Sequence, residues 1–167
     1  MEFRRAELPL TIESYDGKQR ALSSVALCKS LRSATVAAME AAQANFAPQY
    51  VRLVSKDILY TPAGDASFAK GESLFAYFEV YEPQLTENPA APVSVHLRIL
   101  DSSSTQLKED FAPIDAASYK RAGSSVLHIG RKVTINQLPT GNYRLEVQAT
   151  TSMGRSTSWR SANFEVK

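Results

Sequence analysis

The chain has 167 residues, of which 44% are hydrophobic and 22% are charged, a composition typical of a globular domain rather than of a disordered chain. Its formal net charge is only +2, and its lysines and arginines are interleaved with acidic residues, so we expect no nucleic-acid partner. No apolar run approaches the roughly 18 residues that a membrane-spanning helix needs, so we expect no membrane insertion.

The first part of the chain, residues 1–47, is predicted to form a strand or hairpin segment followed by a short helix that packs on the next domain. The pair Asp16-Gly17 suits a tight hairpin turn. Cys28, the only cysteine, follows apolar residues and is expected to be a buried packing residue rather than a nucleophile. Residues 34–46 are rich in helix formers, and Pro48 ends the run. One face of this helix would carry Val36, Met39, Gln43 and Phe46.

Residues 48–167 show the period-two alternation of half-buried strands. Residues 93–100 and 142–150 alternate apolar with polar side chains, and residues 162–166 repeat the pattern more briefly. Residues 126–135 are rich in strand formers but contain Gly130, which predicts a bulge or a turn. Turn residues separate these runs. The predicted fold class is therefore mainly β: an antiparallel immunoglobulin-like β-sandwich with one short N-terminal helix.

A Leu-Pro-Thr-Gly turn at 138–141 leads into the clearest strand of the chain. Pro139 fixes φ and Gly141 permits a corner in the backbone. Tyr143 can then bury its ring while its hydroxyl binds a nearby backbone carbonyl, as in a tyrosine corner. We expect this residue to be structural.

Two short strings imitate catalytic or metal-binding motifs. Residues 101–105, Asp-Ser-Ser-Ser-Thr, match a pattern in which a carboxylate and two hydroxyls hold a divalent cation, but their context favours a polar hairpin loop. Residues 67–70, Ser-Phe-Ala-Lys, match a lysine-activated serine without a helix to support it. His96 and His128 lie on separate strands, with no carboxylate placed to orient either. We therefore predict no catalytic residue, no metal site and no cofactor, and not an enzyme.

The strand at 74–81, Leu-Phe-Ala-Tyr-Phe-Glu-Val-Tyr, has aromatic side chains on both faces. Phe75, Tyr77 and Tyr81 lie on the face that should meet water, which needs an explanation. The favoured one is that the helix or the N-terminal hairpin covers them. The alternative is a stacking platform for a sugar or for a partner's side chains, which Trp159 would join if its strand were a neighbour. These four residues are the candidate ligand-binding residues.

Several stretches resemble one family of bacterial proteins. They are residues 68–81, the Leu-Pro-x-Gly-x-Tyr-x-Leu-x-Val element at 138–147, the closing Phe-Glu-Val at 164–166 and the Leu-Ser-Ser-Val-Ala-Leu run at 22–27. Together they resemble the β-sandwich region C-terminal to the A-type domain of exported von Willebrand factor A-related proteins. An aspartate that the family usually has after the first serine is Ser24 here. The resemblance implies an exported protein (periplasmic, cell-surface or secreted), an A-type domain upstream, and no catalytic residue in this region.

Two functional hypotheses follow. The first is a non-catalytic interaction or spacer module of a larger exported bacterial protein, which contacts a protein partner or the A-type domain of its parent chain at the cell envelope. The second is a carbohydrate-binding module that uses the aromatic face of residues 74–81. The exposure of Phe75, Tyr77 and Tyr81 distinguishes these two hypotheses. If the three rings are covered, the face has a structural role; if they are exposed, it binds a ligand.

Overall fold

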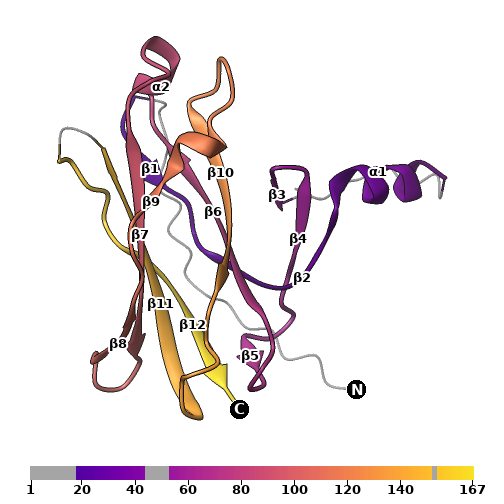
Figure 1. Cartoon of the computed structure of the whole chain (residues 1–167), viewed down its shortest axis with the longest axis vertical. Helices are drawn as coiled ribbons and strands as arrows, with labels where there is room; N and C mark the ends of the chain where they lie inside the picture. Colours follow the sequence, from indigo (N-terminus) through magenta and orange to yellow (C-terminus); the bar gives the residue numbers. More distant parts are fainter. Residues whose placement is uncertain (1–17, 44–52, 152–153) are drawn as a thin grey trace, which may run out of the picture.

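The computed structural model describes residues 18–43, 53–151 and 154–167, which form two packed β-sheets (Figure 1). The first, named here the β6 sheet, consists of β1 (Ala21–Leu22), β2 (Ala26–Ser33), β3 (Leu53–Ser55), β4 (Ile58–Pro62), β6 (Leu74–Tyr81) and β10 (Val126–Val133). The second, the β11 sheet, consists of β5 (Ser67–Phe68), β7 (Val93–Asp101), β8 (Leu107–Asp110), β9 (Ile114–Asp115), β11 (Gly141–Thr151) and β12 (Arg160–Val166). The described helices are α1 (Ala34–Gln43), α2 (Gln84–Glu87) and a 3₁₀ turn, Ala116–Tyr119.

Strand pairing is antiparallel within the described residues, except that β5 runs parallel to β12. The predicted fold class is confirmed: the chain is mainly β and forms an antiparallel, immunoglobulin-like β-sandwich. None of the described helices is long and apolar enough to span a bilayer.

The core lies between the inward faces of the two sheets, where the alternation read from the sequence places it. The alternating side chains of three strands supply about half of it, and each fully buried aliphatic side chain contributes about 1.5–3 kcal/mol. These residues are Leu74, Ala76, Phe78 and Val80 of β6, Val93, Val95, Leu97 and Ile99 of β7, and Tyr143, Leu145, Val147 and Ala149 of β11.

The corner before β11 forms as predicted. The Tyr143 ring is buried in the core, and its hydroxyl donates a hydrogen bond of 2.7 Å to the carbonyl oxygen of Pro139. The ring of Phe164 on β12 packs against it, with 5.6 Å between ring centroids. Tyr143 therefore ties the turn to the sandwich and has no free polar atom for a ligand.

The predicted bulge or turn at Gly130 is wrong. Strand β10 runs unbroken along β6, and the pairing keeps one register from Val126 opposite Tyr81 to Val133 opposite Leu74. A Cβ built at Gly130 would lie 2.0 Å from Cζ of Tyr60. Glycine is needed here because the ring of Tyr60 on β4 lies against this position, not because the backbone bends.

Strand β4, which carries Tyr60, is part of a curl in the β6 sheet. Strand β2 pairs first with β6 and then, after an irregularity between Cys28 and Ser30, with β4. The chain turns at 56–57 between β3 and β4, and Ser55 at the end of β3 reaches β10. Its hydroxyl donates to the His128 carbonyl at 2.6 Å and accepts from the Gly130 N–H at 3.2 Å. Strand β3, at one edge of the sheet, thus contacts β10 at the other edge.

The helix predicted over 34–46 is present as α1 over 34–43, and Figure 1 shows it projecting away from the sandwich. Val36 and Met39 are 51% and 62% exposed, so this part of the predicted apolar face does not pack on the sandwich. Phe46, Pro48 and the turn at 16–17 lie outside the described residues. The N-terminal segment also supplies β1 and β2 to the β6 sheet, while its boundary at residue 47 stays a prediction.

Candidate functional site

The aromatic face of β6 is covered at its centre. Tyr77 is only 3% exposed, and the ring of Tyr60 on β4 packs against it with 5.8 Å between centroids. Phe75 is half-buried and meets the same Tyr60 ring edge-on at 6.4 Å. Cys28 is buried with these rings, as predicted for a packing residue. Within the described residues the cover therefore comes from β4, and α1 does not supply it; the expected hairpin turn at 16–17 lies outside those residues.

The rest of this face is a closed hydrogen-bond group. The hydroxyls of Tyr77 and Tyr81 donate to the two oxygens of Glu79, at 3.1 Å and 2.5 Å. His128, opposite Glu79 on β10, places Nδ1 2.9 Å from the Tyr77 hydroxyl and 3.1 Å from Glu79 Oε1. The prediction that no carboxylate orients His128 is thus wrong.

These groups satisfy one another, while His128 and Glu79 remain partly exposed. Burial, and then the charge and hydrogen bond of Glu79, raise the pKa of Tyr77 well above its usual range, so its phenol stays protonated. Tyr77 has neither an exposed ring nor a free hydroxyl for a sugar. The stacking platform of Phe75, Tyr77 and Tyr81 is therefore not available as predicted.

Trp159 does not join this face. It immediately precedes β12, which pairs with β11 in the other sheet, so its ring lies over the outer surface of β7. The guanidinium carbon of Arg98 is 4.0 Å from the centroid of the Trp159 ring, and the His96 ring meets it edge-on at 5.5 Å. The four predicted site residues therefore lie on opposite outer faces of the sandwich, three on one and Trp159 on the other.

Around Trp159 the β11 sheet carries an ordered set of charged side chains. Glu146 on β11 is buried, and its Oε2 accepts from Arg98 Nε at 2.8 Å while Oε1 accepts from Arg144 Nε at 2.9 Å. His96 Nε2 lies 2.5 Å from Asp110 Oδ1 on β8, so this histidine also has a carboxylate, contrary to the prediction. We name the strip formed by His96, Arg98, Arg144, Glu146 and Trp159 the Trp159 strip.

Part of this strip follows from the alternation in the sequence. Arg98, Arg144 and Glu146 all occupy the polar positions of the two clearest alternating runs, so each was expected to face outward. Their contact depends on the register, in which Glu146 pairs with Arg98. Period two fixes the face of a side chain but not its cross-strand neighbour.

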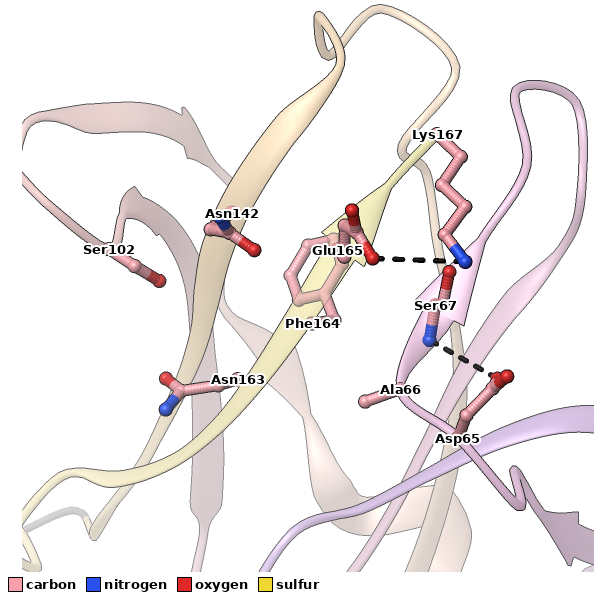
Figure 2. A pocket seen from close by; sticks show the side chains of 9 residues that line it. All are labelled: Asp65, Ala66, Ser67, Ser102, Asn142, Asn163, Phe164, Glu165 and Lys167. Atoms are coloured by element: carbon pink, nitrogen blue, oxygen red, sulfur yellow. Dashed lines mark hydrogen bonds and ion pairs between the residues drawn. The ribbon is translucent and has the colours of Figure 1, made fainter.

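A separate groove lies at one end of the β11 sheet (Figure 2). It is open to solvent and has a volume of about 580 Å³ between the turn after β7 and the ends of β5, β11 and β12. Most of its side chains are polar. The lining residues are Asp65, Ala66, Ser67, Ser102, Asn142, Asn163, Phe164, Glu165 and Lys167.

The two motif-like strings have structural roles at this end of the sheet. Residues 101–105 form the predicted polar turn, here joining β7 to β8. Asp101 Oδ1 accepts hydrogen bonds from the Ser103 hydroxyl at 2.6 Å and from the backbone N–H groups of Ser103 and Ser104. These bonds hold its pKa well below the usual range. Ser67 lies on strand β5 and not on a helix, and Lys70 follows it in a turn.

A scan against protein-family models matches none of them, and a search of curated proteins finds no relative. Among solved structures, the chain is similar to the PKD domain of an M14-like peptidase from a Thermoplasmatales archaeon, at 13% identity over 62% of this chain and 88% of that one, with a TM-score of 0.36. The PmoD soluble domain from Methylocystis sp. matches at 15% identity over 61% and 78%, with a TM-score of 0.34. A family 123 glycoside hydrolase from Clostridium perfringens matches at 8% identity over 89% and 27%, with a TM-score of 0.43. Similarity this low assigns no family, ligand or activity to this chain.

Proposed function

We propose that the chain is a non-catalytic interaction module of a larger exported bacterial protein, and that it contacts an acidic protein partner through the Trp159 strip. The observation that carries the proposal is the position of Arg98, which is stacked on Trp159 and tied to Glu146 at the same time. Two fixed contacts hold the guanidinium in place before any partner arrives, so little side-chain entropy remains to be lost on binding.

The composition of the strip suits a protein contact. Tryptophan and arginine are the side chains most enriched where protein interfaces gain their binding energy. Arg98, Arg144 and Trp159 are each partly exposed, so a partner can reach them. The β-sandwich beneath is a rigid support for such a surface.

The guanidinium groups of the strip suit an acidic group on a partner. Glu146 is shared by two of them, Arg98 and Arg144, and Asp110, opposite Arg98 on β8, is the second carboxylate beside them. A guanidinium has five N–H donors, and only Nε and Nη2 of Arg98 approach Glu146. A carboxylate on the partner can bind the remaining donors in a charge-assisted pair.

The exported setting rests on the resemblance of residues 68–81, 138–147 and 164–166 to the region that follows the A-type domain in von Willebrand factor A-related proteins. In that setting the A-type domain of the parent chain is the first partner to test. A sandwich that follows another domain can present its outer face either to that domain or to a second protein at the cell envelope.

The chain contains a single tryptophan, so its indole N–H reports on the strip without ambiguity. We would titrate the isotope-labelled chain with a capped glutamate-rich peptide, with its glutamine counterpart and with the A-type domain, and follow the spectrum by NMR. We expect the glutamate peptide and the A-type domain to shift the Trp159 indole signal, and the glutamine peptide to leave it unchanged.

Variants then locate the contact. Arg98→Ala should weaken binding about tenfold, because it removes a charged anchor while Arg144 still pairs with Glu146. Arg131→Ala is the matched control, since Arg131 is exposed on β10 in the other sheet. Equal binding by both variants, or equal response to both peptides, would contradict the proposal. A hydrolytic activity that one substitution abolishes would contradict the non-catalytic role.

A further inference from the structure

A row of hydrogen-bonding side chains crosses the end of the β11 sheet at right angles to its strands. Glu165 on β12 pairs with Ser67 on β5 and with Asn142 on β11. The row continues to Ser102, whose N–H donates to the Asn142 carbonyl at 3.0 Å. With strands about 4.8 Å apart, its three steps span about 14 Å. All four residues line the groove in Figure 2.

The groove has hydrogen-bonding capacity that the protein itself does not use. The side-chain amides of Asn142 and Asn163 and the hydroxyl of Ser67 form no hydrogen bond within the described part of the chain. The Ser102 hydroxyl oxygen is buried and also lacks a hydrogen-bond partner among the described residues. A buried polar atom without a partner is unfavourable, but this oxygen is closed to solvent. The groups that a ligand can reach are the exposed amides of Asn142 and Asn163 and the partly exposed Ser67.

The two carboxylates of the groove already face lysines. Asp65 Oδ1 lies 2.9 Å from Lys29 Nζ, and this contact, with the backbone N–H of Ser67, lowers the pKa of Asp65. Glu165 Oε2 lies 3.9 Å from Lys167 Nζ. The groove therefore has no excess charge with which to attract a cation or an anion, and its ligand should be neutral.

From this arrangement we propose that the groove is a binding site for a neutral oligosaccharide. Each carboxamide presents a donor and an acceptor to neighbouring sugar hydroxyls, and the Ser67 hydroxyl and the carboxylates accept further bonds. The row is long enough for more than one sugar ring. The site shares no residue with the Trp159 strip and does not depend on the protein partner proposed above.

An extended peptide fits the same groove less well. Strand addition needs a free backbone edge, and on β5 the Ser67 N–H is directed to Asp65 Oδ1 at 3.4 Å. Phe164 lies beneath the groove but is only 3% exposed, so an aromatic side chain of a peptide finds no ring to pack against there. The same buried ring leaves a sugar without a stacking partner, so the saccharide affinity should be weak.

The test is an NMR titration of the isotope-labelled chain with chitotetraose, cellotetraose and maltotetraose, following the side-chain amide signals of Asn142 and Asn163. At least one tetrasaccharide should shift both signals saturably. Asn142→Ala and Asn163→Ala should each weaken binding about fivefold, in line with the loss of one hydrogen bond. Asn136→Ala is the matched control, because Asn136 is exposed in the turn before β11, outside the groove.

Three results would overturn the saccharide site: none of the tetrasaccharides shifts the two signals; a capped neutral peptide shifts them and the sugars do not; or the control variant loses affinity as much as the groove variants. Arg98→Ala should bind the sugar like the unmodified chain. That variant separates the two proposals, because it impairs only the protein contact.

Discussion

The ring of Tyr60 occupies the space beside Gly130 where any other residue would place its side chain. A Cβ at position 130 would lie 2.0 Å from Cζ and 2.2 Å from the hydroxyl oxygen of Tyr60. This contact lets β4 close over β10 and brings the same ring onto Tyr77. Gly130 on β10 therefore leaves room for the ring that covers Tyr77 on β6.

We predict that Gly130→Ala destabilises the protein by about 1–3 kcal/mol, the range for overpacking a core. Tyr60 is itself buried against Phe75 and Tyr77, so its ring has little room to move aside. Urea unfolding would measure the change. The matched control is Gly64→Ala, because a Cβ there meets no atom within 4 Å.

A double-mutant cycle tests the cause. In a Tyr60→Ala background the space beside Gly130 is free, so Gly130→Ala should have much less effect there. If the substitution destabilises both backgrounds equally, the close approach of Tyr60 is not the reason for the glycine.

The same contact explains which parts of the structure the sequence could predict. Alternation in 93–100 and 142–150 fixes which side chains face the core, and the turn at 138–141 fixes the environment of Tyr143. Both depend on neighbours in the chain. The burial of Tyr77 depends instead on Tyr60, through a curl of the sheet that no local pattern specifies. A glycine within a strand permits either a bulge or a close approach, and only the packing decides between them.

The candidate site was harder to predict for the same reason. Trp159 was placed with Phe75 only on the condition that their strands were neighbours, and the order of strands in a sandwich does not follow from period two. The partners of His96 and His128 are Asp110 and Glu79, which come from other strands. Nothing local to either histidine indicates them.

The loop before β1 is attached to the sandwich by a buried ion pair. Glu82 is only 1% exposed; its carboxylate contacts Arg20 and accepts from the Gln84 N–H at 3.2 Å. Arg20 also donates to the Arg155 carbonyl at 3.0 Å. We predict that Arg20→Ala destabilises the protein by about 3–5 kcal/mol, because it leaves Glu82 buried without its counter-charge. Thermal or urea unfolding would measure the loss.

A second substitution distinguishes the charge from the lost contacts of the arginine side chain. Adding Glu82→Gln to Arg20→Ala removes the uncompensated charge, so part of the stability should return. Should the double variant be no more stable than Arg20→Ala alone, the unpaired carboxylate is not what destabilises the chain.

The hydroxyl of Ser55 joins β3 to β10 across the curl of the β6 sheet. Ser55→Ala would leave the Gly130 N–H and the His128 carbonyl without this partner. We predict a loss of about 1–3 kcal/mol in unfolding free energy and faster hydrogen exchange at the Gly130 amide. Ser30→Ala is the control, because Ser30 is exposed on β2. Unchanged exchange at Gly130 would show that β3 does not protect this edge.

The buried thiol of Cys28 gives the fold a pH dependence in the alkaline range. Burial raises the pKa of Cys28 from 9.0 to about 11, because the thiolate is poorly solvated beneath Tyr60 and Tyr77. The folded chain therefore prefers the neutral thiol more strongly than the unfolded chain does. This contribution is complete below pH 9 and is lost as the pH rises through about 11, and the total loss in unfolding free energy is about 2–3 kcal/mol.

Cys28→Ala isolates this effect, since it removes the titrating group. Unfolding free energies of the two proteins, measured by urea at steps between pH 8 and pH 11.5, should converge as the pH rises, because only the protein with the thiol loses its contribution. Burial also raises the pKa values of Tyr60 and Tyr77, but both proteins contain these phenols, so their effect largely cancels in the difference. A difference that stays constant over the range would show that the thiol is not protected by burial.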